Sequence, residues 1–307
     1  MGNIVHNNGC LVYHYTSLAT LKKLLDGIDK GSFVFHASSI RCMNDTSEFI
    51  YGFKELRRLL PNIEEDLGVK EELRISSIIQ KEEKNILQSW NEQFTDILME
   101  GNLTPFIISL SANGDNIPMW AMYGDNGKGV SLGFDLAKVY IKQESNDGIP
   151  YLDFTKFRLE DPHAFKIRQN LSNTHIAYKY SQMIYKGYLD NARMLPSDYS
   201  LIKLQMNALY QMSMITSALL KHPAFRFENE WRVLGYARCL KDVLYKTNSK
   251  GELISYIEQR IPIPYLRKII IGPCYDGLGK KENIANMLKT YDIPNLKVVS
   301  SKVPFRK

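Results

Sequence analysis

The sequence has no apolar run that approaches the roughly 20 residues needed to cross a bilayer. Its opening stretch, MGNIVHNNGCLVYHY, lacks the basic start and the apolar segment of a secretory signal peptide. The cysteines, Cys10, Cys42, Cys239 and Cys274, form no Cys-x-x-Cys pair and have no histidines at zinc-site spacing. These absences favour a cytoplasmic protein with reduced thiols and no membrane association, and they argue against a disulfide framework.

The chain also lacks internal repeats, low-complexity linkers and a strong excess of charge of one sign. Its 307 residues are 44% hydrophobic and 23% charged, which is an ordinary globular composition with enough apolar residues for one large core. The net charge of +6 permits attraction to nucleic acid or another polyanion, but it is weaker than in dedicated DNA-binding proteins. We therefore expect a single domain that spans residues 1–307.

Apolar stretches in the sequence predict β-strands separated by helices. The predicted strands cover residues 11–16, 32–38, 105–112, 128–134 and 265–273, with a last strand near LKVVSS. Leucines at helical spacing after Thr16 or Ser17, either of which is a suitable N-cap, predict the first helix. Segments of about 55–103 and 160–222 predict helical insertions. This order indicates an α+β fold with a central, mostly antiparallel sheet, and it leaves a separate helical subdomain open.

The segment FENEWRVL, residues 227–234, places two acidic residues and one basic residue among large apolar ones. If it is a strand, Glu228, Glu230 and Arg232 lie on one face and the apolar residues between them lie on the other. Carboxylates on alternate strand residues lie about 7 Å apart, and burying one without a partner costs several kcal/mol. Arg232 would neutralise Glu230, so Glu228 would face water, a helix N-terminus, a cation or a substrate. An ion-pair ladder on an exposed sheet face explains the pattern equally simply.

Three further polar groups interrupt apolar elements. His14 lies at the centre of the first predicted strand, where a histidine is commonly a core or edge residue. The segment MNDTSE (43–48) combines amide and carboxylate groups, and a turn followed by a helix cap also explains it. Ser109 and Ser111 share one face of a buried strand, so their hydroxyls need backbone or ligand partners.

Four blocks follow one another along the chain: LVYHYTSLATLKKLL, MNDTSE, SLSANGDNIPMWAMYGDNGKGVSLGF and KHPAFRFENEWRVL. Together they resemble a widespread bacterial family catalogued as domain of unknown function 2971, and the resemblance spans roughly residues 11–235. The chain has Met-Asn-Asp-Thr where that family tends to have Phe-Asn-Asp-Pro, which loosens the turn but keeps its polar groups. The family name itself supplies no activity.

The chain also resembles, more distantly, the ADP-ribosyltransferases, which cleave NAD. Those enzymes present a first strand with a histidine or arginine, then a Ser-x-Ser strand, and last a Glu-x-Glu or Gln-x-Glu element. The matching positions are His14 with Thr16, Ser109 with Ser111, and Glu228 with Glu230. The resemblance implies a split sheet of the ADP-ribosyltransferase type, with NAD as the substrate.

The same resemblance implies catalytic roles. Cleavage of the nicotinamide–ribose bond passes through an oxocarbenium-like state that a nearby carboxylate stabilises. By resemblance, Glu230 is this carboxylate, Glu228 orients or deprotonates the acceptor, and His14 holds a ribose or phosphate-linked hydroxyl. Ser109 would steady Glu230.

The resemblance also implies residues that bind NAD. Tyr123 or Tyr15 would stack on the nicotinamide ring, and Arg41 or Lys128 would meet the pyrophosphate. The residues do not identify the acceptor of ADP-ribose, which is a protein, a nucleic acid or water, and they do not give the oligomeric state. The setting that such families suggest is a toxic effector in bacterial conflict, such as phage defence.

Two other functions fit the same residues. A Mg²⁺-dependent nuclease would use four carboxylates as ligands: Asp45, Glu48, Glu228 and Glu230. Against it, the residue beside the last two is Arg232 rather than the lysine that is usual in such nucleases. A binding module without turnover would sense a nucleotide or a protein partner through the acid-rich segment 55–100 and the basic tail KVVSSKVPFRK. EDTA and labelled NAD separate the three hypotheses.

Overall fold

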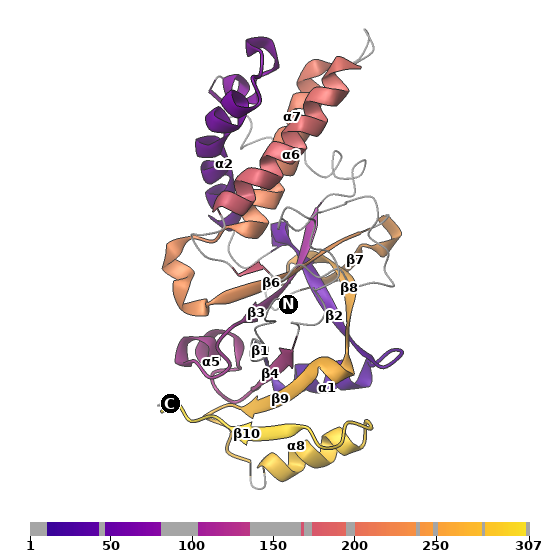
Figure 1. The fold of residues 1–307 in the computed structure, drawn as a ribbon. Helices are drawn as coiled ribbons and strands as arrows, with labels where there is room; N and C mark the ends of the chain where they lie inside the picture. Colours follow the sequence, from indigo (N-terminus) through magenta and orange to yellow (C-terminus); the bar gives the residue numbers. More distant parts are fainter. Residues whose placement is uncertain are drawn as a thin grey trace, which may run out of the picture.

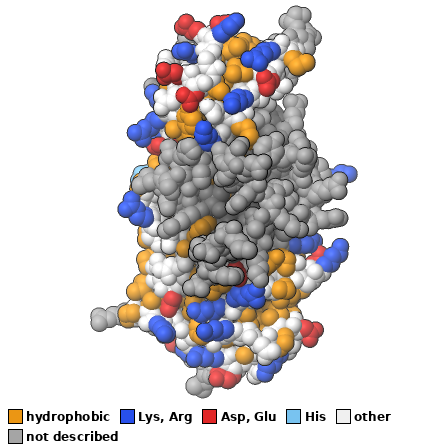
Figure 2. All heavy atoms as spheres, in the orientation of Figure 1, with side chains coloured by type: hydrophobic (Ala, Val, Ile, Leu, Met, Phe, Trp, Pro, Cys, Tyr) orange, Lys and Arg blue, Asp and Glu red, His pale blue; other side chains and the backbone are white. Residues whose placement is uncertain are grey.

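The computed structural model describes residues 11–42, 47–80, 104–135, 167–168, 174–194, 200–237, 240–247, 251–277 and 280–304. The molecule is elongated, with a helical layer at one end and a β-sheet with shorter helices at the other (Figure 1). The helical layer consists of α2 (Ser47–Asp66), α6 (Thr174–Arg193) and α7 (Leu201–Leu219). Basic and acidic side chains are mixed at the helical end, and basic ones predominate over the lower part of the face in Figure 2.

The described strands form one sheet of ten strands. They are β1 Leu11–Thr16, β2 Ser32–Ser39, β3 Pro105–Ser111, β4 Val130–Asp135, β5 Ile167–Arg168, β6 Glu230–Tyr236, β7 Leu244–Thr247, β8 Leu253–Pro262, β9 Leu266–Ile271 and β10 Lys297–Ser300. The shorter helices are α1 Leu18–Asp26, α5 Ile117–Tyr123 and α8 Lys280–Lys289. The strands predicted from apolar stretches all form, with small shifts at their ends, whereas the hairpin of β7 and β8 was not predicted.

The sheet is mostly antiparallel. Its strand order is β10-β9-β4-β1-β3-β2-β8-β7, and β6 pairs with β3 and with β5. Among the described strands, only β9 and β10 pair in parallel. The α+β class and the mostly antiparallel sheet are therefore confirmed. Within the described ranges, no helix combines the length and the apolar character that crossing a membrane requires.

Strand β3 is the point at which the sheet divides. One edge of β3 pairs along its whole length with β6. The other edge pairs with β1 at Ser111 and with β2 at Phe106 and Ile107. Between these two points, residues 108–110 have no partner on that edge among the described strands. We call this opening the sheet gap.

Different layers cover the two faces of the sheet. On one face, Ile107 of β3 and Leu234 of β6 pack into a core with α2, α6 and α7. On the other face, α1 contributes Leu21, Leu24 and Leu25 to a second core with residues of β1, β2, β3, β4 and β9. The helical layer therefore lies on the face of β3 and β6 that also holds Ser109, Ser111, Glu230 and Arg232.

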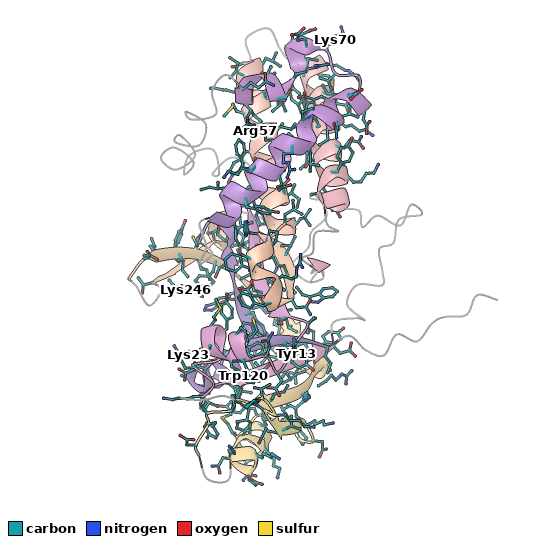
Figure 3. All side chains as sticks on the ribbon, turned by 90° about the vertical axis from the view of Figure 1, so that its left-hand side faces the viewer. Tyr13, Lys23, Arg57, Lys70, Trp120 and Lys246 are labelled. Atoms are coloured by element: carbon teal, nitrogen blue, oxygen red, sulfur yellow. The ribbon has the colours of Figure 1, made fainter. Side chains whose placement is uncertain are left out.

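Helix α5 covers β1 on the face opposite α1. Tyr15 of β1 contacts Trp120 of α5 edge to face, with ring centroids 4.8 Å apart. Tyr13 lies against Gly133 of β4, where an added Cβ would approach the tyrosine ring to 2.8 Å. Figure 3 shows Tyr13 and Trp120 together in the sheet half of the molecule, well separated from Arg57 at the helical end.

Helices α2 and α7 approach each other closely at Gly52. A Cβ added to Gly52 would lie 2.2 Å from Ser217 Oγ and 2.5 Å from Ser217 Cα, so no larger residue fits. Glu48 lies one turn before Gly52 on the same face of α2. The close approach therefore brings the Glu48 carboxylate to Arg232, which lies against the C-terminal end of α7.

The substitution Gly52→Ala is expected to lower the free energy of unfolding by about 1–3 kcal/mol, because the added methyl group meets the backbone of α7 at Ser217 as well as the Ser217 hydroxyl. Urea denaturation followed by circular dichroism measures this change.

Gly187 of α6 provides the matched control, since an added Cβ there has nothing within 4 Å. Gly187→Ala is expected to raise the free energy of unfolding by about 0.5–1 kcal/mol through its better helix propensity. An unchanged stability of the Gly52→Ala protein would contradict the close helix contact.

Candidate functional site

A cavity of about 1150 Å³ lies at the sheet gap. Its walls come from β1, β2, β3, α1, α5 and the 3₁₀ turn η5 (Pro223–Glu228), and on the far side from β7 and β8. Successive residues of β1, Tyr13 and His14, both line it, as do Ser109 and Leu110 of β3. Since successive strand residues point to opposite faces, the cavity extends through the gap to both faces of the sheet.

Several predicted site residues line this cavity: His14, Tyr15, Ser109, Tyr123, Glu228 and Glu230. Thr16 and Ser111 are buried and are not among its described lining residues. Arg41 belongs to the turn η1 (Ile40–Cys42), and its side chain lies outside the described residues. Lys128 is exposed and does not line the described wall. The cavity therefore brings together residues from three separate blocks of the sequence.

Five charged side chains form a buried cluster at one end of the cavity: Glu48, Lys221, Glu228, Glu230 and Arg232. We call this group the charge cluster. Arg232 is completely buried, the three carboxylate side chains are each 4% exposed, and Lys221 is 10% exposed. Charges removed from water to this degree require charged partners, and the cluster supplies them.

Arg232 joins two of the carboxylates. Its Nε lies 3.1 Å from Glu230 Oε1 and its Nη2 lies 3.2 Å from Glu230 Oε2. Nη2 also donates to Glu48, and Nη1 donates to the Ser217 carbonyl at 3.2 Å, near the end of α7. The strand β6, the helix α2 and the helix α7 are thereby held to one guanidinium.

Lys221, just beyond the end of α7, joins all three carboxylates. Its Nζ lies 2.8 Å from Glu230 Oε2, 3.2 Å from Glu48 Oε1 and 2.5 Å from Glu228 Oε2. The sequence analysis did not identify Lys221 as a site residue. The signal lay in the block KHPAFRFENEWRVL, which starts with this lysine, but the turn η5 that brings it back to the carboxylates was not predicted.

The charges in the cluster shift one another's pKa values. Burial raises the pKa of the Glu230 carboxyl, but the charges of Arg232 and Lys221 outweigh burial and lower that pKa to about 2. Burial by itself lowers the pKa values of Lys221 and Arg232, yet the facing carboxylates raise both above their usual range. The cluster thus places three carboxyl groups against two basic groups.

Simple alternation in FENEWRVL requires Glu228 to lie on the strand, but Glu228 lies before it. Strand β6 begins at Glu230, Glu228 ends the turn η5, and Asn229 between them has a left-handed φ of 43°. Ser111 Oγ donates a hydrogen bond of 2.7 Å to the Glu228 carbonyl, which fixes the turn. On the α5 side, the Tyr123 hydroxyl donates to Glu228 Oε1 at 3.0 Å.

His14 is held in one tautomer by the backbone of β3. Its Nδ1 lies 3.3 Å from the Ser109 carbonyl oxygen, which only accepts, so Nδ1 carries the hydrogen and Nε2 is an acceptor. Burial lowers the pKa of the imidazole and outweighs that hydrogen bond, which raises it. The ring is therefore neutral at pH 7. It packs edge to face with the Phe35 ring, and the two ring centroids are 5.3 Å apart.

His14 and Glu230 reach the cavity from opposite faces of the sheet. His14 shares its face of β1 with Val12, which belongs to the core under α1, whereas Glu230 pairs with Ser111 on the face toward α7. Both line one cavity because that cavity extends through the gap. The Ser109 hydroxyl is buried without a hydrogen-bond partner among the described residues, so it does not steady Glu230 in this structure.

Tyr15 and Tyr123, the two tyrosines predicted as candidates for stacking on nicotinamide, differ in how firmly the structure holds them. The Tyr15 hydroxyl donates to the Asn113 carbonyl at 2.7 Å and accepts from the Asn116 N–H at 3.1 Å, and its ring is buried against Trp120. Tyr123 is only half-buried: its hydroxyl bonds to Glu228, and its ring packs at the edge of the cluster that contains Tyr15 and Trp120. Tyr123 is therefore the aromatic ring that a ligand in the cavity can contact.

Basic side chains lie along other parts of the cavity wall. Lys23 of α1 and Lys246 of β7 both line it, and Figure 3 shows them on the same side of the molecule, with Lys246 on the hairpin that projects from the sheet. Burial lowers the pKa of Lys246. Arg260 also lines the wall, but Asp29 accepts hydrogen bonds of 3.0 and 2.8 Å from it. The cavity thus has an acidic end and a basic side.

Within the described ranges, no group of three or more histidine, cysteine or acidic side chains has the arrangement of a metal site. Glu48, Glu228 and Glu230 converge, but they converge on Lys221 and Arg232. The cations occupy the carboxylate oxygens that a Mg²⁺ ion would need, so this arrangement does not favour the predicted nuclease site. Asp45, its fourth predicted ligand, lies outside the described residues.

Comparison with known proteins gives one match. Residues 119–233 match the family described as "Protein of unknown function (DUF2971)". The match covers a little over a third of the chain and includes Tyr123, Glu228 and Glu230, and it supports the family resemblance found in the sequence blocks. No curated protein and no solved structure matches the chain significantly. The likeness to ADP-ribosyltransferases therefore stays a prediction.

The substitution Lys221→Met is expected to lower the free energy of unfolding by about 3–5 kcal/mol, because it leaves three buried carboxylates facing Arg232 alone. Lys22→Met is the control, since the side chains of Lys22 and its partner Asp26 are each 52% exposed and their pair contributes little. Urea denaturation compares the two proteins. Equal, small effects would show that the charge cluster does not stabilise the fold.

Acid is expected to weaken the fold through Glu230. The pKa of this carboxyl is about 2 in the folded protein, below its usual 4.5, so the unfolded chain binds the proton more readily. Its contribution is complete above the usual pKa and is lost as the pH falls through that window, on the order of 3 kcal/mol in total. Urea denaturation at several pH values measures the loss. A Glu230→Gln protein with the same acid dependence would contradict this assignment.

Proposed function

We propose that the chain is an ADP-ribosyltransferase-type enzyme that uses NAD as a substrate. The observation that supports this most is the single cavity at the sheet gap. It is lined by an imidazole (His14), an aromatic ring (Tyr123) and two carboxylates (Glu228 and Glu230) that come from distant parts of the chain. The cavity of about 1150 Å³ is slightly above the range of about 300–1,000 Å³ that is usual for small-ligand sites, so it has room for a dinucleotide.

The chemistry suits this set of residues. In the proposed step, the bond between C1′ of the ribose and the nicotinamide nitrogen breaks, and its electron pair stays on the nitrogen. The positive charge moves from the ring to the ribose, where a carboxylate of the acidic end stabilises it. An oxygen or nitrogen of the acceptor then bonds to C1′ and loses its proton. The acceptor is a protein, a nucleic acid or water.

The state of His14 supports a role in holding the ribose. A neutral imidazole whose Nδ1–H is used by the Ser109 carbonyl presents Nε2 as an acceptor, and a ribose hydroxyl is a matching donor. The basic side of the cavity, with Lys23 and Lys246, suits the two phosphates. Each polar part of NAD thus has a complementary part of the wall.

One observation favours a second function, a nucleotide-binding module without turnover. Both oxygens of Glu230 already bond to Arg232, and one of them also bonds to Lys221. A carboxylate held in this way has little freedom to move during a reaction. A binding module does not need that freedom, because it binds the nucleotide without cleaving it. Turnover decides between the two functions.

The test is the release of nicotinamide from NAD by the purified protein, followed by chromatography, together with direct measurement of NAD binding by calorimetry. We expect release that EDTA leaves unchanged, since no metal ion takes part. His14→Leu is expected to lower the rate about 100-fold, because it removes the hydroxyl acceptor while keeping an apolar contact with Phe35.

His36→Leu is the matched control. His36 also lines the cavity, but it stacks on Tyr256 at 4.2 Å on the far side and has no assigned role. Its rate is expected to equal that of the unaltered protein. Binding of NAD without release would support the sensor instead, and the absence of both binding and release would overturn the proposal.

A further inference from the structure

We infer that Glu228, together with Tyr123, is the group that meets the positively charged ring of the ligand, and that Glu230 is a positioning residue. This inference rests on the proposed function and assigns the part of the cavity that recognises nicotinamide. The class of ligand group is a planar aromatic cation. The sequence pattern does not distinguish the roles of Glu228 and Glu230, but their contacts in the structure do.

Both oxygens of Glu230 are held by cations. Its Oε1 accepts from Arg232 Nε, and its Oε2 accepts from Arg232 Nη2 and from Lys221 Nζ at 2.8 Å. Arg232 is completely buried, so it depends on these bonds for its neutralisation. A ligand that drew Glu230 away would leave a buried guanidinium short of one partner. Glu230 therefore fixes the cluster in place.

Glu228 is in the opposite situation. One of its oxygens, Oε2, contacts Lys221, while Oε1 accepts, within the described part of the chain, only from the neutral hydroxyl of Tyr123. A carboxylate oxygen accepts about two hydrogen bonds, so Oε1 retains capacity for another donor. The Arg232 charge is shared by Glu48 and Glu230, and the Lys221 charge is shared by all three carboxylates. Among the described residues, Glu228 is therefore the carboxyl group with the fewest contacts with the two cations, since it contacts Lys221 whereas Glu48 and Glu230 contact both Lys221 and Arg232.

The position of Glu228 also suits this role. It lies on the turn η5 rather than on the strand, because Asn229 takes the left-handed conformation between it and β6. The hydrogen bond from Ser111 Oγ to its carbonyl fixes that turn from the sheet side. The carboxylate is thus held on the cavity wall by a rigid backbone.

Aromatic side chains surround the same place. Tyr123 of α5 and Phe225 of η5 both line the cavity, and their elements contact each other. Phe225 already lies near a cation, since Lys221 Nζ is 5.2 Å from its ring centroid. An aromatic cation between such rings and beside a carboxylate is favoured by both the ring quadrupoles and the charge. The acidic end of the cavity therefore prefers a charged ring to a neutral ring of the same shape.

Binding of ring fragments tests this inference without any turnover. The probes are 1-methylnicotinamide, which carries a positive charge, and nicotinamide, which does not, both measured by calorimetry or by ligand-observed NMR. The unaltered protein is expected to bind the cation about tenfold more tightly. Glu228→Gln is expected to remove this preference, and in the same variant NAD is expected to bind no more tightly than NADH, whose reduced nicotinamide ring is neutral.

Glu258→Gln is the matched control, because it removes one negative charge from the β8 part of the same wall. It is expected to keep the preference for the cation. If Glu228→Gln does not fold, as judged by circular dichroism, Tyr123→Leu replaces it, and the loss of the ring is expected to weaken binding of the cation several-fold more than binding of the neutral probe.

The outcomes separate this inference from the proposed activity. Equal binding of the two probes by the unaltered protein, or a preference that survives both Glu228→Gln and Tyr123→Leu, overturns the assignment of Glu228 even if nicotinamide release is observed. A preference that these substitutions remove supports the assignment, including in a protein that binds NAD without cleaving it.

Discussion

A guanidinium that is wholly buried determines much of this architecture. Arg232 sits between the sheet and α7, and folding can place it there only if carboxylates arrive with it. Glu230 comes from the same strand, Glu48 comes from α2, and the backbone carbonyl of Ser217 comes from α7. Three segments that are far apart in the chain, β6, α2 and α7, are therefore fixed relative to one another by the need to neutralise one charge.

Much of the fold follows from local features of the sequence. Continuous apolar stretches gave β1, β3 and β9, and Ser17 is the N-cap of α1, as one of the two predicted alternatives. The hairpin of β7 and β8 escaped prediction for a physical reason. Most residues of β8 are only half-buried, and β7 is largely exposed, so neither strand shows the alternation of apolar and polar residues that marks a sheet with one covered face.

The sequence indicated the types of residue in the site but not the contacts among their side chains. His14, Glu228 and Glu230 stood out because polar groups interrupted apolar elements, and Tyr123 was implied by the resemblance to ADP-ribosyltransferases. All four line one cavity. The places of Glu48 and Lys221 depend on a helix contact at Gly52 and on a turn after α7, which only the assembled chain determines. Strand alternation also failed at Glu228, since one residue with positive φ redirects the chain.

The way in which β1 joins β3 has a mechanical consequence. A single residue pair, Tyr13 with Ser111, links these two strands, so the block of β10, β9, β4 and β1 is attached to the rest of the sheet by few interstrand rungs. The core under α1 contains residues from both parts of the sheet, and Phe134 of β4 contacts Phe33 and Phe35 of β2 edge to face. Side-chain packing, rather than a ladder of backbone hydrogen bonds, therefore holds the two parts together across the opening.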